Sequence, residues 1–185
     1  MKKLIFLLML TCLTACSSSL DEHQINHPEF DLKGYFDGNI HAWGIVQDYS
    51  RRLTRQFCVD IKASWQNNNG TLHETFYFDD GEQQVRIWQL EIHSDGSVSG
   101  TAGDVVGTAT GKAKGNALNW QYVLSVPIDN NVYEFSIDDW LYQMDSQHMM
   151  NRSYMQKFGV TVAEISIFFK KTRLPASCSS LPSNG

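Results

Sequence analysis

Apolar and polar residues alternate along much of the chain between Gly34 and Lys171. The alternation is clearest from Leu118 to Val126, and it recurs over residues 53–65, 72–78, 133–137 and 163–169. A period of two places successive side chains on opposite faces of a β-strand, so these segments are predicted to be strands with one buried face.

Turn-forming residues separate the predicted strands. NNNG, DDGE, SDG and DNN, which begin at Asn67, Asp79, Ser94 and Asp129, are typical of hairpin connections. Short strands joined by successive hairpins predict an all-β protein, an antiparallel up-and-down meander. Roughly eight to ten such strands can remove their open edges by closing into a barrel, which is the expected architecture. A two-sheet β-sandwich is the alternative.

The first fifteen residues have the pattern of a secretory signal. Lys2 and Lys3 precede an apolar run over residues 4–10, which is about half of the ~20 residues that a membrane-spanning helix requires. LTAC followed by SSS resembles the bacterial lipoprotein signal, which implies cleavage before Cys16 and lipidation of that cysteine. In that signal class, Ser17 implies the outer membrane, here its periplasmic face. A plain secretory signal is the alternative.

The remaining chain is predicted to form one domain, since 185 residues with 42% hydrophobic content suffice for a single core. The expected division is a signal peptide at 1–15, a lipidated tether at 16–29, a barrel domain at 30–173 and a flexible tail at 174–185. Loss of Lys2 and Lys3 changes the formal charge from -5 to -7. This acidic balance argues against nucleic acid as a partner.

Two cysteines remain for the mature domain once Cys12 leaves with the signal and Cys16 is lipidated. In an oxidising envelope Cys58 and Cys178 could form a disulfide that pins the tail to a strand. Two free thiols are the alternative.

Four charged residues are in phase with the apolar face of their strands: Arg55, Glu74, Arg86 and Asp139. A buried charge is costly unless it is paired, so these residues should meet one another or lie at a wet barrel mouth. They would then form a polar patch in an apolar lumen that holds the head group of an amphipathic ligand, with the two arginines attracting an acidic group. Alternatively, bulges shift the phase and leave ordinary ion pairs at the rim.

The lumen prediction also includes two tryptophans, Trp88 and Trp120. The adjacent apolar residues Ile87 and Trp88 predict a β-bulge, which would shift the phase of Arg86 relative to the apolar face.

Sequence motifs give no catalytic residues, no metal ligands and no cofactor. The glycine-rich stretch 96–115 has no phosphate-binding motif and lies in predicted strands, GxSxG is absent, and the histidines show no zinc-ligand spacing. The protein is therefore not expected to be an enzyme.

Six strings together resemble one known family. They are GYFDG at Gly34, AWGIVQD at Ala42, TAGDVVGTATG at Thr101, GNALNWQY at Gly115, DDW at Asp138 and NRSYMQKFG at Asn151. The family consists of small bacterial lipoproteins with a domain of unknown function, and the resemblance covers about Phe30 to Lys171. It implies a role in lipid handling at the envelope. GYFDG and Arg173 also resemble features of lipocalin-type barrels.

The expected function is that of an outer-membrane-anchored binding module for a small apolar or amphipathic, acyl-type ligand. Its expected partners are the membrane, through the lipid anchor, and this hydrophobic ligand. One alternative is a structural or accessory envelope protein whose solid barrel serves a protein partner, and another is a lipid-modifying enzyme.

Overall fold

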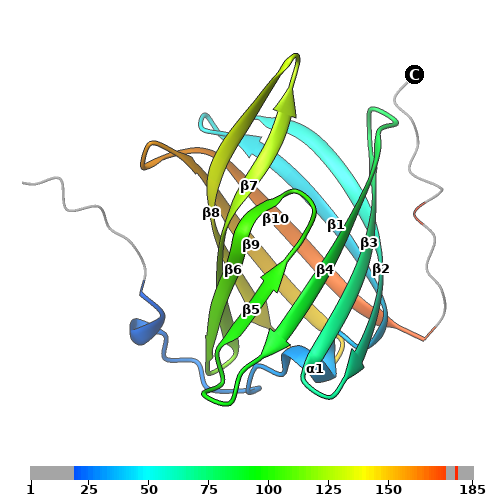
Figure 1. Ribbon diagram of the computed structural model, residues 1–185, viewed down its shortest axis with the longest axis vertical. Helices are drawn as coiled ribbons and strands as arrows, with labels where there is room; N and C mark the ends of the chain where they lie inside the picture. The colour runs from blue at the N-terminus through cyan, green and yellow to red at the C-terminus, as the bar shows by residue number, and fades with distance from the viewer. Residues whose placement is uncertain (1–18, 174–177, 179–185) are drawn as a thin grey trace, which may run out of the picture.

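The computed structural model describes residues 19–173 and 178, and almost all of them belong to one antiparallel β-barrel (Figure 1). A short 3₁₀ helix and a single helical turn, α1, precede the strands. The ten strands are β1 (Gly38–Asp48), β2 (Leu53–Gln66), β3 (Asn69–Phe78), β4 (Gln83–Ile92), β5 (Val98–Thr101), β6 (Val105–Lys114), β7 (Ala117–Ile128), β8 (Asn131–Gln143), β9 (His148–Lys157) and β10 (Val160–Thr172).

The strands follow one another around the barrel in sequence order, and β1 pairs with β10 to close it. Each hairpin joins antiparallel neighbours, as the spacing of turn residues predicted. The closed up-and-down barrel is therefore confirmed, and the alternative of a two-sheet sandwich is wrong. Closure gives every strand a partner on both sides and so removes the exposed edges of an open sheet.

Irregular register occurs at three places, and none is the bulge predicted near Ile87 and Trp88. The shifts lie in the β1–β2, β9–β10 and β6–β7 pairings, whereas β3 and β4 pair without interruption. Ile87 is instead an outward-facing apolar residue, 43% exposed, and Trp88 is buried. The phase of β4 is thus preserved, and Arg86 shares the inward face with Trp88.

One end of the barrel is closed by α1 (Leu32–Tyr35). The Asp31 side chain caps this turn by accepting a hydrogen bond from the Gly34 backbone N–H at 2.8 Å. The Trp65 indole N–H donates to the Phe36 carbonyl at 2.5 Å, and the Tyr35 hydroxyl donates to the Gln147 carbonyl at 3.1 Å. These bonds hold the turn against the strand ends.

The described part of the predicted tether is not a free linker. The 3₁₀ helix (Leu20–Glu22) is followed by a segment that packs on the β6–β7 turn, where the Asn116 backbone N–H donates to the Ile25 carbonyl at 3.1 Å. His23 is hydrogen-bonded to the Asn116 side chain at 2.8 Å. Polar composition alone could not reveal these contacts, because they are made largely by the backbone.

The predicted signal peptide, Cys16 and most of the predicted tail lie outside the described residues. Within residues 19–173 and 178, no helix has the length and hydropathy needed to cross a bilayer.

Candidate functional site

The barrel encloses a cavity of about 790 Å³. Its walls are mainly apolar and come from nearly every strand. Phe36 lines it at the closed end, whereas Glu82 and Pro127 line it beside the hairpins of the opposite end, the mouth. The volume lies within the range of roughly 300–1,000 Å³ that is usual for small-molecule sites.

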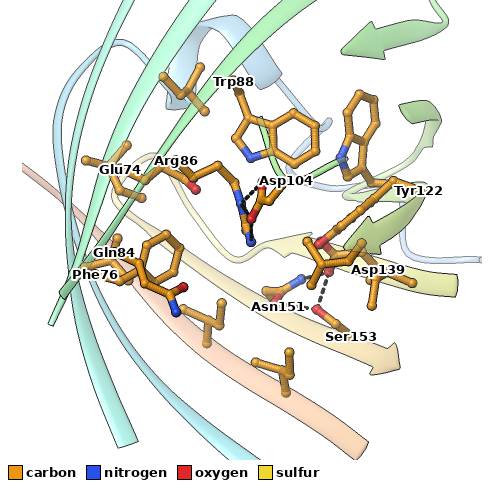
Figure 2. Close-up of a pocket in the computed structure, with 18 of the residues that line it drawn as sticks. Glu74, Phe76, Gln84, Arg86, Trp88, Asp104, Tyr122, Asp139, Asn151 and Ser153 are labelled. Atoms are coloured by element: carbon orange, nitrogen blue, oxygen red, sulfur yellow. Dashed lines mark hydrogen bonds and ion pairs between the residues drawn. The ribbon is translucent and has the colours of Figure 1, made fainter. Parts of the chain in front are cut away.

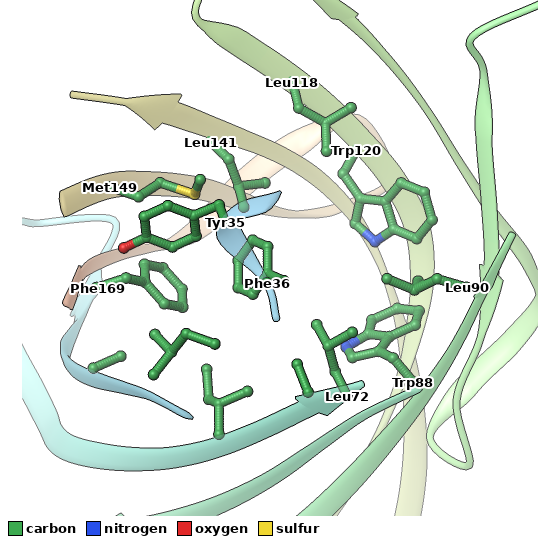
Figure 3. Packing of buried hydrophobic residues seen from close by; sticks show 14 of the residues in the cluster. Tyr35, Phe36, Leu72, Trp88, Leu90, Leu118, Trp120, Leu141, Met149 and Phe169 are labelled. Atoms are coloured by element: carbon green, nitrogen blue, oxygen red, sulfur yellow. The ribbon is translucent and has the colours of Figure 1, made fainter. Parts of the chain in front are cut away.

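The closed end is a layer of packed apolar side chains (Figure 3). Tyr35 of α1 and Phe36, which follows it, point among residues from the strands around them. Phe36 meets Phe169 edge-on, with ring centroids 5.9 Å apart. Tyr35 and Phe36 are only 1% and 4% exposed, so they fill this end of the barrel.

The wall between β4 and β7 is incomplete near the mouth. The short strand β5 pairs with β4 only over Gln89–Ile92, and β6 pairs with β7 only up to Leu124. The β5–β6 hairpin therefore stops below its neighbours (Figure 1). Gln84 is in phase with Arg86 on the inward face of β4 and lines the cavity, and it is nevertheless exposed, so the lumen opens to solvent beside this hairpin.

Seven polar residues form what we call the deep polar cluster (Figure 2). Its members come from five strands and one turn and all line the cavity: Glu74, Arg86, Asp104, Tyr122, Asp139, Asn151 and Ser153. The cluster contains three carboxyl groups and one guanidinium.

Arg86 is held by Asp104 from the β5–β6 turn. Its Nε lies 3.0 and 2.9 Å from the two carboxylate oxygens, and its terminal nitrogen lies 2.7 Å from one of them. Such a bidentate pair is strong and directional. The guanidinium thus ties the turn of the short hairpin to β4 and is itself largely neutralised.

Glu74 lies directly opposite Arg86 in the β3–β4 pairing. The residue is 9% exposed. Among the described residues, none donates a hydrogen bond to its carboxyl group, although Arg86 acts on it electrostatically. The Glu74 oxygens are not among the fully buried atoms that lack a partner, so they face the space of the cavity, where a ligand can donate to them.

The carboxyl group of Asp139, on β8, accepts hydrogen bonds from protein groups, unlike that of Glu74. It accepts a hydrogen bond from the Ser153 hydroxyl at 2.7 Å and another from the Asn151 amide, both on β9. Asn151 also donates to the Trp140 carbonyl at 3.1 Å. These neighbours orient the carboxyl group in the lumen opposite the wall that carries Glu74 and Arg86 (Figure 2).

Burial shifts the acidities of these groups upward. It raises the pKa of Glu74 to about 7, an effect that Arg86 only partly offsets. It raises the pKa of Asp139 to about 6 against the opposing hydrogen bonds from Ser153 and Asn151. The pKa of Tyr122 is raised well above its usual value by burial and by Asp139. Loss of water disfavours each anion, and the single guanidinium is too little to compensate.

Arg55 lies at the mouth and belongs to a different group of charges. Its guanidinium lies 3.6 Å above the ring of Phe78 and forms ion pairs with Asp80 and Glu82, both at 2.8 Å. Within the described chain, its Nε is the one buried side-chain nitrogen or oxygen without a hydrogen-bond partner. This group is the rim ion pair that the alternative interpretation of the sequence expected.

Trp88 and Trp120 form an aromatic wall next to the cluster. Their rings meet edge-on with centroids 5.7 Å apart. Gly100 and Gly111 make room for Trp120, since a Cβ on either glycine would lie 3.0 or 2.6 Å from the indole. The glycine-rich segment therefore serves packing.

All six lumen candidates of the sequence line the cavity: Arg55, Glu74, Arg86, Asp139, Trp88 and Trp120. Glu74, Arg86 and Asp139 belong to the deep polar cluster, whereas Arg55 lies apart at the mouth. The expected attraction of an acidic head group by Arg55 and Arg86 is offset, because both guanidinium groups already bind carboxylates.

Four members of the cluster were missed: Asp104, Tyr122, Asn151 and Ser153. Asn151 and Ser153 are in phase with the buried Met149, so alternation could have identified them. Asp104 lies in a turn, where side-chain direction does not follow the period of a strand.

Cys58 and Cys178 form a disulfide on the outer side of the barrel wall. His41 and Asp60 flank it, with a hydrogen bond of 2.9 Å between their side chains, and the Cys178 backbone N–H donates to Asp60 at 3.1 Å. His41 and the two sulfur atoms lie close enough to hold a metal ion together, but the disulfide removes both thiolates as ligands.

Residues 10–171 match the model of the family described as "Protein of unknown function (DUF3833)". The chain belongs to this family. No curated protein matches it. The DUF3833 chain therefore has no relative of established activity in that comparison, and the family name carries no function.

Solved structures with a similar fold have very different sequences. The S-type phycobiliprotein lyase CPES from Guillardia theta is 7% identical, with a TM-score of 0.54 over 76% of this chain and 89% of the lyase. Lobster apocrustacyanin A1 is 14% identical, with a TM-score of 0.38 over 78% of this chain and 65% of the other. At this identity, the likeness to the lyase shows a shared barrel fold and no shared activity.

Proposed function

We propose that this DUF3833 protein is a lipid-anchored binding module of the outer membrane that holds a small amphipathic molecule, with an acyl-type chain, in its barrel. The observation that carries the proposal is the cavity of about 790 Å³, whose apolar walls enclose one polar cluster. A long apolar chain can bury its surface against these walls, while a polar end meets the cluster. A cavity of this size argues against a solid barrel.

A cavity-filling substitution tests the proposal. Ile137 is buried on the lumen face of β8, and its neighbour Ser136 is exposed on the outer face. We expect Ile137→Trp to weaken binding of 1-dodecanol at least ten-fold, because the indole occupies the space of the chain, whereas Ser136→Trp should leave binding unchanged. The measurement is quenching of tryptophan fluorescence, corrected for the added indole, on protein secreted with Cys16→Ser.

Native mass spectrometry of the same secreted protein adds a second measurement. We expect a co-purifying acyl compound that Ile137→Trp loses and Ser136→Trp retains. An empty protein that also fails to take up 1-dodecanol would overturn the binding function.

The second candidate is a lipid-modifying enzyme. It is favoured by one observation: Glu74, with a pKa of about 7, resembles a general base in a cavity. Mass spectrometry of the ligand after incubation with the protein distinguishes a binding module from an enzyme. An unchanged mass supports the binding module, whereas a chemically altered ligand would favour the enzyme.

The anchor would hold the closed end of the barrel toward the membrane. Ser19 begins a segment fastened to the β6–β7 turn, at the same end as α1, and Cys16 precedes it by only three residues, a reach of ~10 Å. The mouth then faces away from the anchoring leaflet, so the ligand exchanges with the periplasm.

Lipidation itself gives a further prediction. We expect the protein to incorporate labelled palmitate and to fractionate with the outer membrane. Cys16→Ser should abolish both and move the protein to the soluble periplasmic fraction, because several acyl chains are needed for stable attachment. Retention of the Cys16→Ser protein in the membrane fraction would contradict the anchor.

A further inference from the structure

The deep polar cluster contains more acceptors than its own residues use. Arg86 donates its hydrogen bonds to Asp104, and Asp139 receives those of Ser153 and Asn151. Glu74 is left without a donor among the described residues, although it is nine-tenths buried and lines the cavity. An acceptor that faces the cavity without a donor from the protein is a place for a donor from a ligand.

The net charge of the deep polar cluster also favours a ligand that carries a donor. One guanidinium faces the three carboxyl groups of Glu74, Asp104 and Asp139, so the fully ionised cluster carries an excess of two negative charges. The surrounding walls are mainly apolar and include the buried Trp88 and Trp120. A cation bound here would supply both the missing charge and the missing donor.

We propose that the deep polar cluster is a receptor for a protonated amine at the head of the bound molecule, an inference that rests on the proposed binding function. The ammonium group donates to Glu74 on the β3 wall and lies within the field of Asp139 on the opposite wall. The alkyl part of the ligand extends along the apolar lumen toward the mouth. A carboxylate head group would instead meet three like-charged groups.

The burial of Glu74 agrees with this assignment. With no ligand present, its raised pKa, about 7, means that ionisation at this position lacks a compensating partner. The groups that face it are Arg86 on β4, Asp104 on the β5–β6 turn, Tyr122 on β7 and Asp139 on β8. Of these, only Arg86 is cationic.

Three probes with the same chain length test the head group: dodecylammonium, 1-dodecanol and dodecanoate, the two ions below their micellar concentrations and the alcohol below its solubility limit. Dissociation constants are measured at pH 8 by tryptophan fluorescence on protein secreted with Cys16→Ser. We expect dodecylammonium to bind at least ten-fold more tightly than dodecanoate, with 1-dodecanol between them. Equal or tighter binding of dodecanoate would overturn the amine receptor and leave the binding function intact.

Two variants make the test specific to Glu74. Glu74→Gln keeps the size of the side chain and removes its charge, and it should weaken dodecylammonium about ten-fold while changing 1-dodecanol little. Glu91→Gln removes the same charge from the outer face of the same sheet, where Glu91 is exposed, and should change neither. Unchanged amine affinity in Glu74→Gln would contradict the proposal.

The native sequence provides a measurement that does not depend on the variant's folding. An alkylammonium stays charged between pH 5 and pH 8, since amines of this type titrate near ~10.4. Its affinity should therefore rise several-fold over this range as Glu74 loses its proton, whereas that of 1-dodecanol should stay constant. A flat amine profile would also overturn the inference. If none of the three probes binds, it is the binding function itself that fails.

Discussion

Replacing both Cys58 and Cys178 by alanine is expected to lower the free energy of unfolding by on the order of 4 kcal/mol. The disulfide joins residues separated by 120 positions, a loop that contains nearly the whole barrel. Cross-linking restricts the unfolded chain, and for a loop of this length the entropic effect is near the upper end of the usual range. Urea unfolding followed by circular dichroism measures the change.

The double substitution avoids a free thiol beside His41, which a single substitution would leave. The parent protein unfolded in a reducing agent should reproduce the loss, and the reducing agent should have no effect on the double variant. A difference of less than about 1 kcal/mol between parent and double variant would mean that the cross-link contributes little to this fold.

The barrel could be predicted from local properties of the chain. Alternation along 118–126 fixes which side chains share a face, and turn sequences such as DDGE fix where the chain reverses. Since each hairpin places the next strand beside the last, roughly eight to ten strands can lose their open edges by closing into a barrel, which made the barrel the expected architecture. Glu74 and Asp139 were identified by the same alternation, which survives because the strands that carry them pair without a shift at these positions.

The partners of these charged residues could not be predicted. Asp104 reaches Arg86 from a turn, and the chain gives no period from which the direction of a turn side chain follows. Cys58 and Cys178 were the expected pair if a disulfide forms, but whether they bond depends on the distance between Cys178 and β2, which is a tertiary property. The cavity is also a tertiary property. Its volume depends on how far α1 enters the barrel and on the short β5–β6 hairpin, and no local sequence pattern indicates either feature.

The stability of the domain should fall as the pH rises from 5 to 8, and Glu74 should be the main cause. Its pKa in the folded state is raised to about 7, and that of Asp139 to about 6, while both titrate near their ordinary values of 4.5 and 3.8 when unfolded. The folded protein therefore binds more protons between these limits. The stability that these two protonated groups contribute is fully present below their pKa values in the unfolded protein. It is lost as the pH rises through their pKa values in the folded protein.

The size of the effect follows from the shifts. One pKa unit corresponds to about 1.4 kcal/mol, so Glu74 alone contributes a change on the order of 3 kcal/mol in the free energy of unfolding. The acids whose pKa is lowered, such as Asp48 and Asp145, act in the opposite sense but below this range. Urea titrations at pH 5, 6, 7 and 8 on the protein secreted with Cys16→Ser measure the profile.

Glu74→Gln should flatten most of this profile and should be the more stable protein at pH 8, because the amide carries no charge to desolvate. Glu91→Gln provides the matched control and should keep the slope of the parent, since its side chain is exposed on the outer face of β4. An unchanged slope in Glu74→Gln would mean that water or a bound cation already compensates the carboxylate in solution. Addition of dodecylammonium to the parent separates these two cases: a hydrated carboxylate is ionised throughout this range and gives the same stabilisation at every pH, whereas a site that already holds a cation gains little from the added amine.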